Sequence, residues 1–325
     1  MRNIICLTLS ILFFTILLSC TTVKIHKKAK EYNLKAVELI NQGNYEMAER
    51  SLEIALEYNK NYAEAYNNLG IIYLRQNKLN KAEEFFSVAI EYNGDFAEAH
   101  NNLGYVYMLE GRTNKAEQRF KSALNIDPSF VNARVNLARL YILDKRYEEA
   151  ESQLKKLRLI SSSEEVYSLL INVYIRTHKI NKAFELVDEM IESKEYSTKG
   201  YYLRGYLNLT LNRCEDAISD FRKVEREYEN SIEFLTNLSA SFICKKDYEN
   251  GKIVLKKVLM IQPDEPAALF NLGRIAYENN DYIEAERYFD RSYKSGFVQA
   301  CPYLVDVLFH NGKKEESMKI SEMCK

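Results

Sequence analysis

Residues 63–96 read AEAYNNLGIIYLRQNKLNKAEEFFSVAIEYNGDF, and the stretch that follows, 97–130, reads AEAHNNLGYVYMLEGRTNKAEQRFKSALNIDPSF. The two stretches carry many of the same small and apolar residues at the same positions. One of these positions recurs along the chain as Ala48, Ala82, Ala116, Ala150, Ala183, Ala217, Gly251 and Ala285. A fixed period between about 20 and 50 residues predicts stacked supersecondary repeats, because each repeat can bury its apolar face only against its neighbours.

Each repeat is expected to contain two helices, and strand signals are nearly absent. Apolar residues separated by three, four and seven positions form one stripe of a helix. Gly70 and Gly104 fall in the middle of a predicted helix, where glycine costs about 0.5–1 kcal/mol relative to alanine. We expect close contact with a neighbouring helix to offset this cost. Residues that separate or end helices occur at Gly43, Asn44, Gly111, Pro128, Pro263 and Gly312.

Several positions recur together with the alanine. In 63–96 they are Leu69, Gly70, Tyr73, Ala82, Phe86 and Ala89, and each returns at the same place in 97–130. This combination resembles the tetratricopeptide repeat. The resemblance implies an all-α fold, an α-solenoid of about nine helix-turn-helix repeats forming a right-handed superhelix. The repeats are expected to begin near residues 29, 63, 97, 131, 164, 198, 232, 266 and 298, so that the solenoid covers residues 29–325.

Residues 1–19 are expected to form a lipoprotein signal peptide. Arg2 precedes an apolar run over residues 4–18, which is typical of a secretory signal. This run is shorter than the roughly 20 apolar residues that a membrane-spanning helix needs. Residues 17–20 read Leu-Leu-Ser-Cys and resemble the lipobox of bacterial lipoproteins, which implies cleavage before Cys20 and acylation of its thiol. An ordinary cleaved signal or a short uncleaved anchor is the alternative.

Residues 20–28 would then be a lipidated N-terminus and tether. Thr21 rather than aspartate follows Cys20. By resemblance to lipoproteins of Gram-negative bacteria, this implies an outer-membrane location facing the periplasm, with surface display as the open alternative. The tether is basic, and it is interpreted either as a solvated linker or, less simply, as a lipid-recognition segment.

Composition and motifs argue against several classes of function. The 45 lysines and arginines are balanced by 46 aspartates and glutamates, without a basic stripe, so no nucleic-acid partner is expected. No glycine-rich phosphate loop, Gly-x-Ser-x-Gly or His-Glu-x-x-His motif occurs in the sequence. We therefore expect no enzyme activity, no catalytic residues, no cofactor and no small-molecule substrate.

Isolated polar residues are expected to be structural. His100 occupies a position that holds tyrosine in the preceding repeats, which indicates packing rather than general-base catalysis. Glu148, Glu149 and Glu151 flank Ala150 and are expected to form a solvated helix face. The histidines are scattered and no two cysteines are separated by two to four residues, so no metal site is expected.

Four cysteines lie beyond Cys20 in the sequence. On the repeat, Cys214 begins the second helix of one repeat and Cys244 is near the end of the first helix of the next, while Cys301 and Cys324 fall on the two helices of the final repeat. Because these helices are antiparallel neighbours, Cys214–Cys244 and Cys301–Cys324 are candidate disulfides, which an oxidising periplasm would permit. Buried free thiols are the alternative.

The resemblance implies that function resides on a surface, the concave groove formed by the first helices, which holds an extended segment or a helix of a partner protein. Asparagine recurs at one position on these helices, and an amide offers donors and an acceptor to a peptide backbone. The alternative is that these asparagines bond only their neighbours. The candidate groove residues are Asn68, Ile71, Asn102, Tyr105, Asn136, Arg139, Tyr206, Asn271 and Arg274.

The anchor and the repeats together suggest two functions of the binding class. A lipoprotein made almost entirely of tetratricopeptide repeats resembles the pilotins of type IV pili, which help the outer-membrane secretin to insert and assemble. The resemblance rests on Cys20 and the repeats from Tyr32 to Phe130, and it implies secretin, pilus or other envelope proteins as partners. The alternative is an adaptor lipoprotein that gathers peptidoglycan hydrolases or proteases. A glycan-binding or enzymatic role is a remote alternative.

Overall fold

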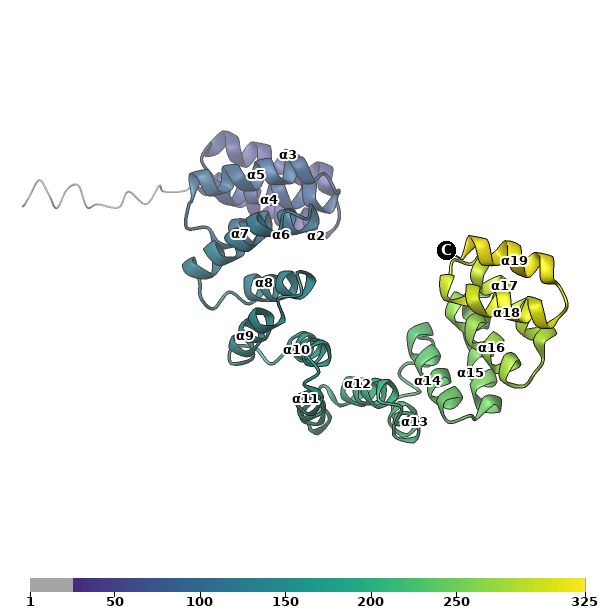
Figure 1. Cartoon of the computed structure of the whole chain (residues 1–325). Helices are drawn as coiled ribbons and strands as arrows, with labels where there is room; N and C mark the ends of the chain where they lie inside the picture. Colours follow the sequence, from purple (N-terminus) through teal and green to yellow (C-terminus); the bar gives the residue numbers. More distant parts are fainter. Residues whose placement is uncertain (1–25, 325) are drawn as a thin grey trace, which may run out of the picture. The chain divides into compact units, whose positions relative to one another are not determined.

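A computed structural model describes residues 26–324 (Figure 1). Every regular element in this range is a helix, which confirms the predicted all-α repeat fold. The first helices of successive pairs are α2 (Lys27–Asn41), α4 (Ala63–Arg75), α6 (Ala97–Leu109), α8 (Val131–Leu143), α10 (Glu164–Arg176), α12 (Ser197–Thr210), α14 (Ile232–Cys244), α16 (Pro266–Glu278) and α18 (Cys301–His310), the last preceded by the short 3-10 helix η1 (Val298–Ala300). Their partners are α3 (Tyr45–Tyr58), α5 (Leu79–Tyr92), α7 (Thr113–Ile126), α9 (Tyr147–Arg158), α11 (Ile180–Glu192), α13 (Cys214–Arg222), α15 (Tyr248–Ile261), α17 (Tyr282–Lys294) and α19 (Lys314–Met323). Across residues 26–324 no helix is both long and apolar enough to cross a membrane.

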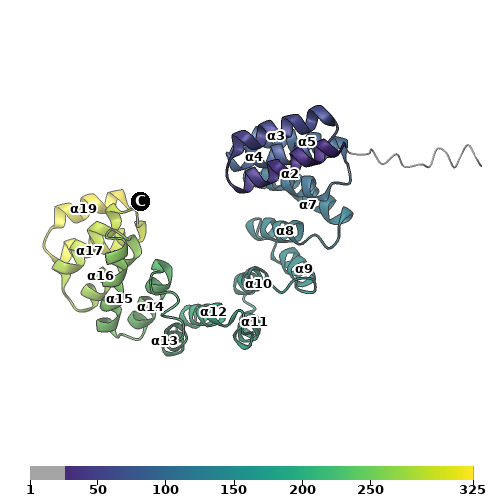
Figure 2. The ribbon, with the colours of Figure 1, turned by 180° about the vertical axis from the view of Figure 1, so that it is seen from behind.

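The chain divides into two compact units after Ser161, in the connection between α9 and α10. In the first compact unit α2 packs against α3 and α4 packs against α5, and the four helices lie side by side in both views (Figures 1 and 2). In the second compact unit, successive helices from α10 to α19 pack in chain order. The sequence pattern does not reveal this division, because the alanine period continues through both compact units.

Within a repeat, a small residue on the first helix faces a large residue on the second. A methyl group placed on Gly104 would lie 2.8 Å from two ring carbons of Phe120, and one on Gly70 would lie 2.5 Å from the ring of Phe86. The expected close contact of both mid-helix glycines is therefore confirmed. The same pairing recurs as Gly205 with Phe221 and Gly273 with Phe289. The same two repeat positions hold a buried alanine and a buried leucine at Ala36 and Leu52 and at Ala138 and Leu154.

The turn between the two helices of a repeat contains one residue with a left-handed backbone. At Gly43 and Gly111, which were expected to separate the helices of a repeat, this residue is glycine, with φ of 76° and 70°. After Gly43, the amide of Asn44 donates to Leu39 O at 2.9 Å, which satisfies a carbonyl at the end of α2. Left-handed backbones that are not glycine occur in the corresponding turns at Asn77, Lys145, His178, Asn212, Lys246 and Asn280.

Neighbouring repeats in the first compact unit are joined by a glutamate, a tyrosine and an arginine. Glu117 on α7 accepts hydrogen bonds from Tyr141 Oη at 2.9 Å and from Arg146 Nη1 at 2.6 Å. The Arg146 guanidinium also lies 4.4 Å from the centroid of the Tyr141 ring. Burial alone would raise the pKa of Glu117, but hydrogen bonds from Arg146, Lys121 and Tyr141 outweigh it and lower the pKa to about 2. This carboxylate is therefore ionised at neutral pH.

The same group recurs one repeat earlier. Arg112 Nη1 lies 2.6 Å from Glu83 Oε2, and its guanidinium lies 4.2 Å from the centroid of the Tyr107 ring. One further repeat towards the N-terminus, Tyr73 hydrogen-bonds Glu49. The second helix of each of these repeats is thus tied to the following repeat by a charged group as well as by apolar packing.

Candidate functional site

Three neighbouring first helices of the first compact unit present matched side chains on one face. We call this set the first-helix row; it consists of Ile71, Tyr105 and Arg139 at one position of the repeat, and of Leu74, Met108 and Ile142 one turn later, on α4, α6 and α8. Arg139 is exposed and the other five side chains are partly exposed. The row therefore offers apolar and aromatic surface, with a guanidinium on α8.

Asparagine side chains bond neighbouring repeats beside this row. The bonds are Asn68 Nδ2 to Asn33 Oδ1 at 2.8 Å, Asn102 Nδ2 to Asn67 Oδ1 at 3.0 Å, Asn136 Nδ2 to Asn101 Oδ1 at 2.9 Å and Asn101 Nδ2 to Asn102 Oδ1 at 3.3 Å. We call these six residues the asparagine ladder. Its three inter-repeat bonds each join the first helices of two successive repeats, so that the amides fix the spacing of the first-helix row.

The asparagine ladder shows that these asparagines hydrogen-bond to asparagines of the neighbouring repeats, which was the alternative to contact with a bound peptide. Each inter-repeat bond occupies one of the two amide hydrogens of its donor, so a second hydrogen remains for another acceptor. Asn68 is buried, whereas Asn102 and Asn136 are partly exposed. Contact of these two amides with a bound peptide stays a prediction.

The remaining candidate groove residues belong to the second compact unit. Tyr206 on α12 is 39% exposed, and Asn271 and Arg274 on α16 are partly exposed. A cavity of about 530 Å³ opens between α14 and its neighbours and includes Arg274, Lys246 and Glu278 in its lining. Sequence reasoning treated all the candidates as one groove, but the structure places them on two compact units.

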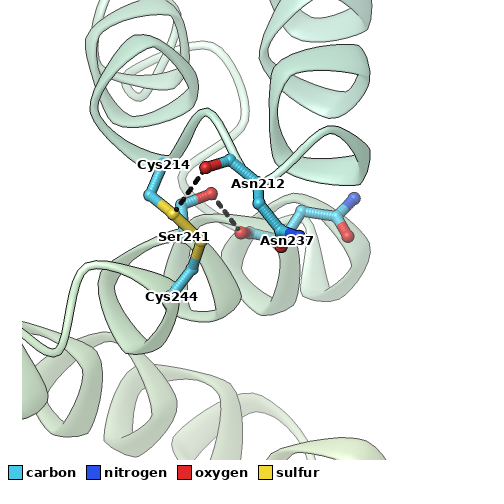
Figure 3. The surroundings of a disulfide bond; sticks show 5 residues. All are labelled: Asn212, Cys214, Asn237, Ser241 and Cys244. Carbon is cyan, nitrogen blue, oxygen red and sulfur yellow. Dashed lines mark hydrogen bonds between the residues drawn. A yellow bond between two sulfur atoms is a disulfide. The ribbon is translucent and has the colours of Figure 1, made fainter.

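The structure brings both candidate cysteine pairs together. Cys214 at the start of α13 is joined to Cys244 at the end of α14, with a Cα–Cα distance of 5.7 Å (Figure 3). Cys301 and Cys324 are joined with a Cα–Cα distance of 5.9 Å. Both distances fit a disulfide, for which Cα–Cα is usually about 4.4–6.8 Å. The first bond links two repeats and the second closes the final repeat. Cys20, the candidate lipid site, lies outside the described residues.

Residues considered for catalysis have structural surroundings. His100 is buried, and its Nε2 lies 3.0 Å from Gly94 O; desolvation lowers the pKa of the imidazole, which favours its neutral form. Among residues 26–324 no group of three or more histidine, cysteine, aspartate or glutamate side chains is placed to hold a metal ion.

The expectation that Glu151 lies on a solvated helix face was wrong, because this residue is 8% exposed. It occupies the repeat position of Glu83 and Glu117, next to the buried alanine of the second helix, and an ion pair with Lys155 at 2.6 Å compensates for its burial. Sequence reasoning missed this carboxylate series, although its signal was present: Glu49, Glu83, Glu117 and Glu151 each follow directly after an alanine of the periodic series.

Comparison with known structures gives similar folds. The type IV pilus biogenesis factor PilW is 20% identical, with a TM-score of 0.57 over 66% of this chain and 99% of PilW. PilF of Pseudomonas aeruginosa is 19% identical, with a TM-score of 0.55 over 64% of this chain and 95% of PilF. At such low identity these likenesses show the fold alone. No curated protein sequence matches the chain.

Comparison with family models identifies the repeats. Models of the tetratricopeptide repeat match residues 33–96, 107–170 and 252–304, and a model of the PPR repeat matches residues 165–194. The segments matched by the tetratricopeptide models include Ala48, Ala82, Ala116, Ala150 and Ala285 of the periodic series, and the structure folds these segments into successive helix pairs. The chain therefore belongs to the tetratricopeptide repeat family.

Proposed function

We propose that the protein is a lipid-anchored periplasmic scaffold that holds a segment of a partner protein on its first-helix row. The observation that carries the proposal is the row itself: three successive helices present apolar or aromatic side chains at a fixed spacing, and the asparagine ladder holds them in register. An amphipathic partner segment would bury the apolar side chains, and its backbone would meet the partly exposed amides.

The anchor in this proposal is an acylated Cys20. Its support is the lipobox-like sequence at residues 17–20, after an apolar run typical of a secretory signal. Each acyl methylene buried in a bilayer contributes about 0.8 kcal/mol, and stable attachment takes more than one chain. The paired cysteines of the second compact unit add support for an oxidising compartment, because disulfides persist in the periplasm and are rare in the cytosol.

For the partner, we favour an envelope machine such as a type IV pilus secretin. PilW and PilF are similar in fold over about two thirds of this chain, and PilW is described as a type IV pilus biogenesis factor. An adaptor that gathers peptidoglycan hydrolases or proteases remains the second candidate, because it would use the same anchor and the same row. The disulfide that joins two repeats suits either role, since it stabilises the scaffold.

Crosslinking of intact cells separates the two candidates. The protein would be purified from solubilised envelopes after crosslinking, and its covalent partners would be identified by mass spectrometry. We expect a secretin or pilus components. Recovery of hydrolases or proteases would favour the adaptor, and the absence of any partner from repeated experiments would contradict the scaffold.

A further inference from the structure

Aromatic and basic side chains gather at the N-terminal edge of the first repeat. The ring of His26 stacks on Tyr58 with centroids 5.0 Å apart and an interplanar angle of 10°, and Tyr32 stacks on the same tyrosine at 6.2 Å. Lys28 Nζ lies 3.4 Å from Tyr58 Oη and 5.3 Å from the centroid of its ring. We call His26, Lys28, Tyr32 and Tyr58 the N-terminal edge cluster.

The cluster is exposed and is fixed by the helix beneath it. Tyr58 is 40% exposed, and His26 and Lys28 are both exposed. His26 is also the N-cap of α2, since its Nδ1 accepts a hydrogen bond from the amide of Lys28 at 3.3 Å. The four side chains of the cluster therefore form an ordered surface rather than a set of independent groups.

The equivalent edge of the next repeat has the tyrosine without the excess of lysine. Tyr92 occupies the repeat position of Tyr58, is 43% exposed and stacks on Tyr66 at 5.4 Å. The matching residues 60–66 and 91–95 contain one lysine and three acidic residues, whereas residues 26–32 and 57–61 contain four lysines and two glutamates. Tyrosine and an excess of lysine therefore occur together at the first edge, whereas the tyrosine at the second edge has no excess of lysine around it.

We propose that the N-terminal edge cluster rests on the membrane surface and contacts anionic phospholipid headgroups. Tyrosine suits this position because its ring is apolar and its hydroxyl is polar, so it partitions to the interface between lipid and water. Exposed lysines next to it are attracted to anionic headgroups within about one Debye length, roughly 8–10 Å. The stack on His26 and Tyr32 holds the Tyr58 ring in place for that contact.

The proposal rests on acylation of Cys20, because the length of chain between the lipid and the cluster sets the reach. Six residue steps separate Cys20 from His26, which span at most about 22 Å when fully extended. The headgroup region occupies roughly 5–8 Å on each side of a bilayer. The edge cluster is therefore confined close to the headgroups, where even a weak contact is populated because the anchor keeps its effective concentration high.

Tryptophan fluorescence in vesicles tests the contact. The sequence has no tryptophan, so Tyr58→Trp introduces a single reporter, and Tyr92→Trp provides a control at the same repeat position with similar exposure. The full lipidated chain would be reconstituted into vesicles of phosphatidylethanolamine and phosphatidylglycerol with brominated acyl chains, which quench tryptophan that reaches the acyl boundary. We expect Tyr58→Trp to lose about half of its emission or more, as for a side chain about 5–10 Å into the interface, and Tyr92→Trp to keep its emission.

Flotation of the same vesicles separates failure of the contact from failure of the anchor. If the protein floats but Tyr58→Trp is not quenched, or is quenched no more than Tyr92→Trp, the edge contact is refuted and the anchor stands. If the protein does not float, the anchor and the contact are both refuted. Adding Lys27→Glu and Lys28→Glu to Tyr58→Trp is expected to abolish most of the quenching, and unchanged quenching would overturn the role of the lysines.

Discussion

Replacing Gly104 by alanine is expected to destabilise the third repeat, and replacing Phe120 by leucine in the same chain is expected to add little further loss, although it is destabilising on its own. The new methyl group would lie 2.8 Å from two ring carbons of Phe120 and 3.2 Å from Arg119 Cβ. Overpacking of this kind costs about 1–3 kcal/mol. Alanine also gains about 0.5–1 kcal/mol over glycine in a helix, so we expect a net loss of about 0.5–2 kcal/mol.

Phe120→Leu alone removes ring atoms from a fully buried site. Phenylalanine-to-alanine changes in cores cost about 3–5 kcal/mol, and leucine fills part of that volume, so we expect about 1–2 kcal/mol. In the double variant the new methyl group occupies space that the ring has vacated, and the pair becomes alanine and leucine, the residues that the next repeat holds at these two positions as Ala138 and Leu154. The two changes should therefore couple favourably by about 1–2 kcal/mol.

Native-state hydrogen exchange of the α6 and α7 amides is the assay. The two compact units need not unfold together, so the midpoint of a global unfolding curve would combine their two transitions. The reciprocal pair Ala138→Gly and Leu154→Phe on α8 and α9 is the matched control, and it should also be tolerated better together than singly. A loss in the double variant equal to the sum of the single losses would show that the facing pair does not determine the packing.

Three further predictions concern the anchor, the charged group and the disulfides. Cys20→Ala should release the protein from membranes or leave it as precursor, judged by fractionation and mass; a mature-size variant that still requires detergent for extraction would contradict acylation. The pKa of Glu117 is lowered to about 2, below its ordinary value, so its stabilising contribution is present above that ordinary value and is lost as the pH falls towards 2. Glu117→Gln should therefore make the stability of the first compact unit less dependent on pH in this range, and an unchanged acid-unfolding profile would refute it. Non-reducing peptide mapping of protein from native envelopes should recover Cys214 linked to Cys244 and Cys301 linked to Cys324, whereas four free thiols would contradict an oxidised fold.

The sequence was sufficient for features that repeat with one period. The alanine series and the mid-helix glycines predicted the helix pairs and the close contact that Phe86 and Phe120 supply. Gly43 and Gly111 predicted the turns that separate the two helices of a repeat, and both glycines lie in such turns. Each of these inferences depends on local conformation or on neighbours within one repeat.

Features that depend on the relative placement of two repeats were harder to predict. Asn102 was visible as a recurring residue, but its acceptor Asn67 belongs to the preceding repeat, and only the stacking of α4 on α6 brings the two amides to 3.0 Å. Glu151 was misjudged because its charge suggested solvent, whereas its repeat position is buried. The division after Ser161 had no counterpart in the alanine period.

Site-specific photocrosslinking in living cells tests the scaffold proposal most directly. A photoreactive amino acid would replace Tyr105, in the centre of the first-helix row, and in a second strain it would replace Gln118, an exposed residue on α7 outside the row. The proposal predicts covalent adducts with an envelope protein from position 105 and none from position 118. Equal adducts from both positions, or adducts from position 118 alone, would contradict binding on the first-helix row.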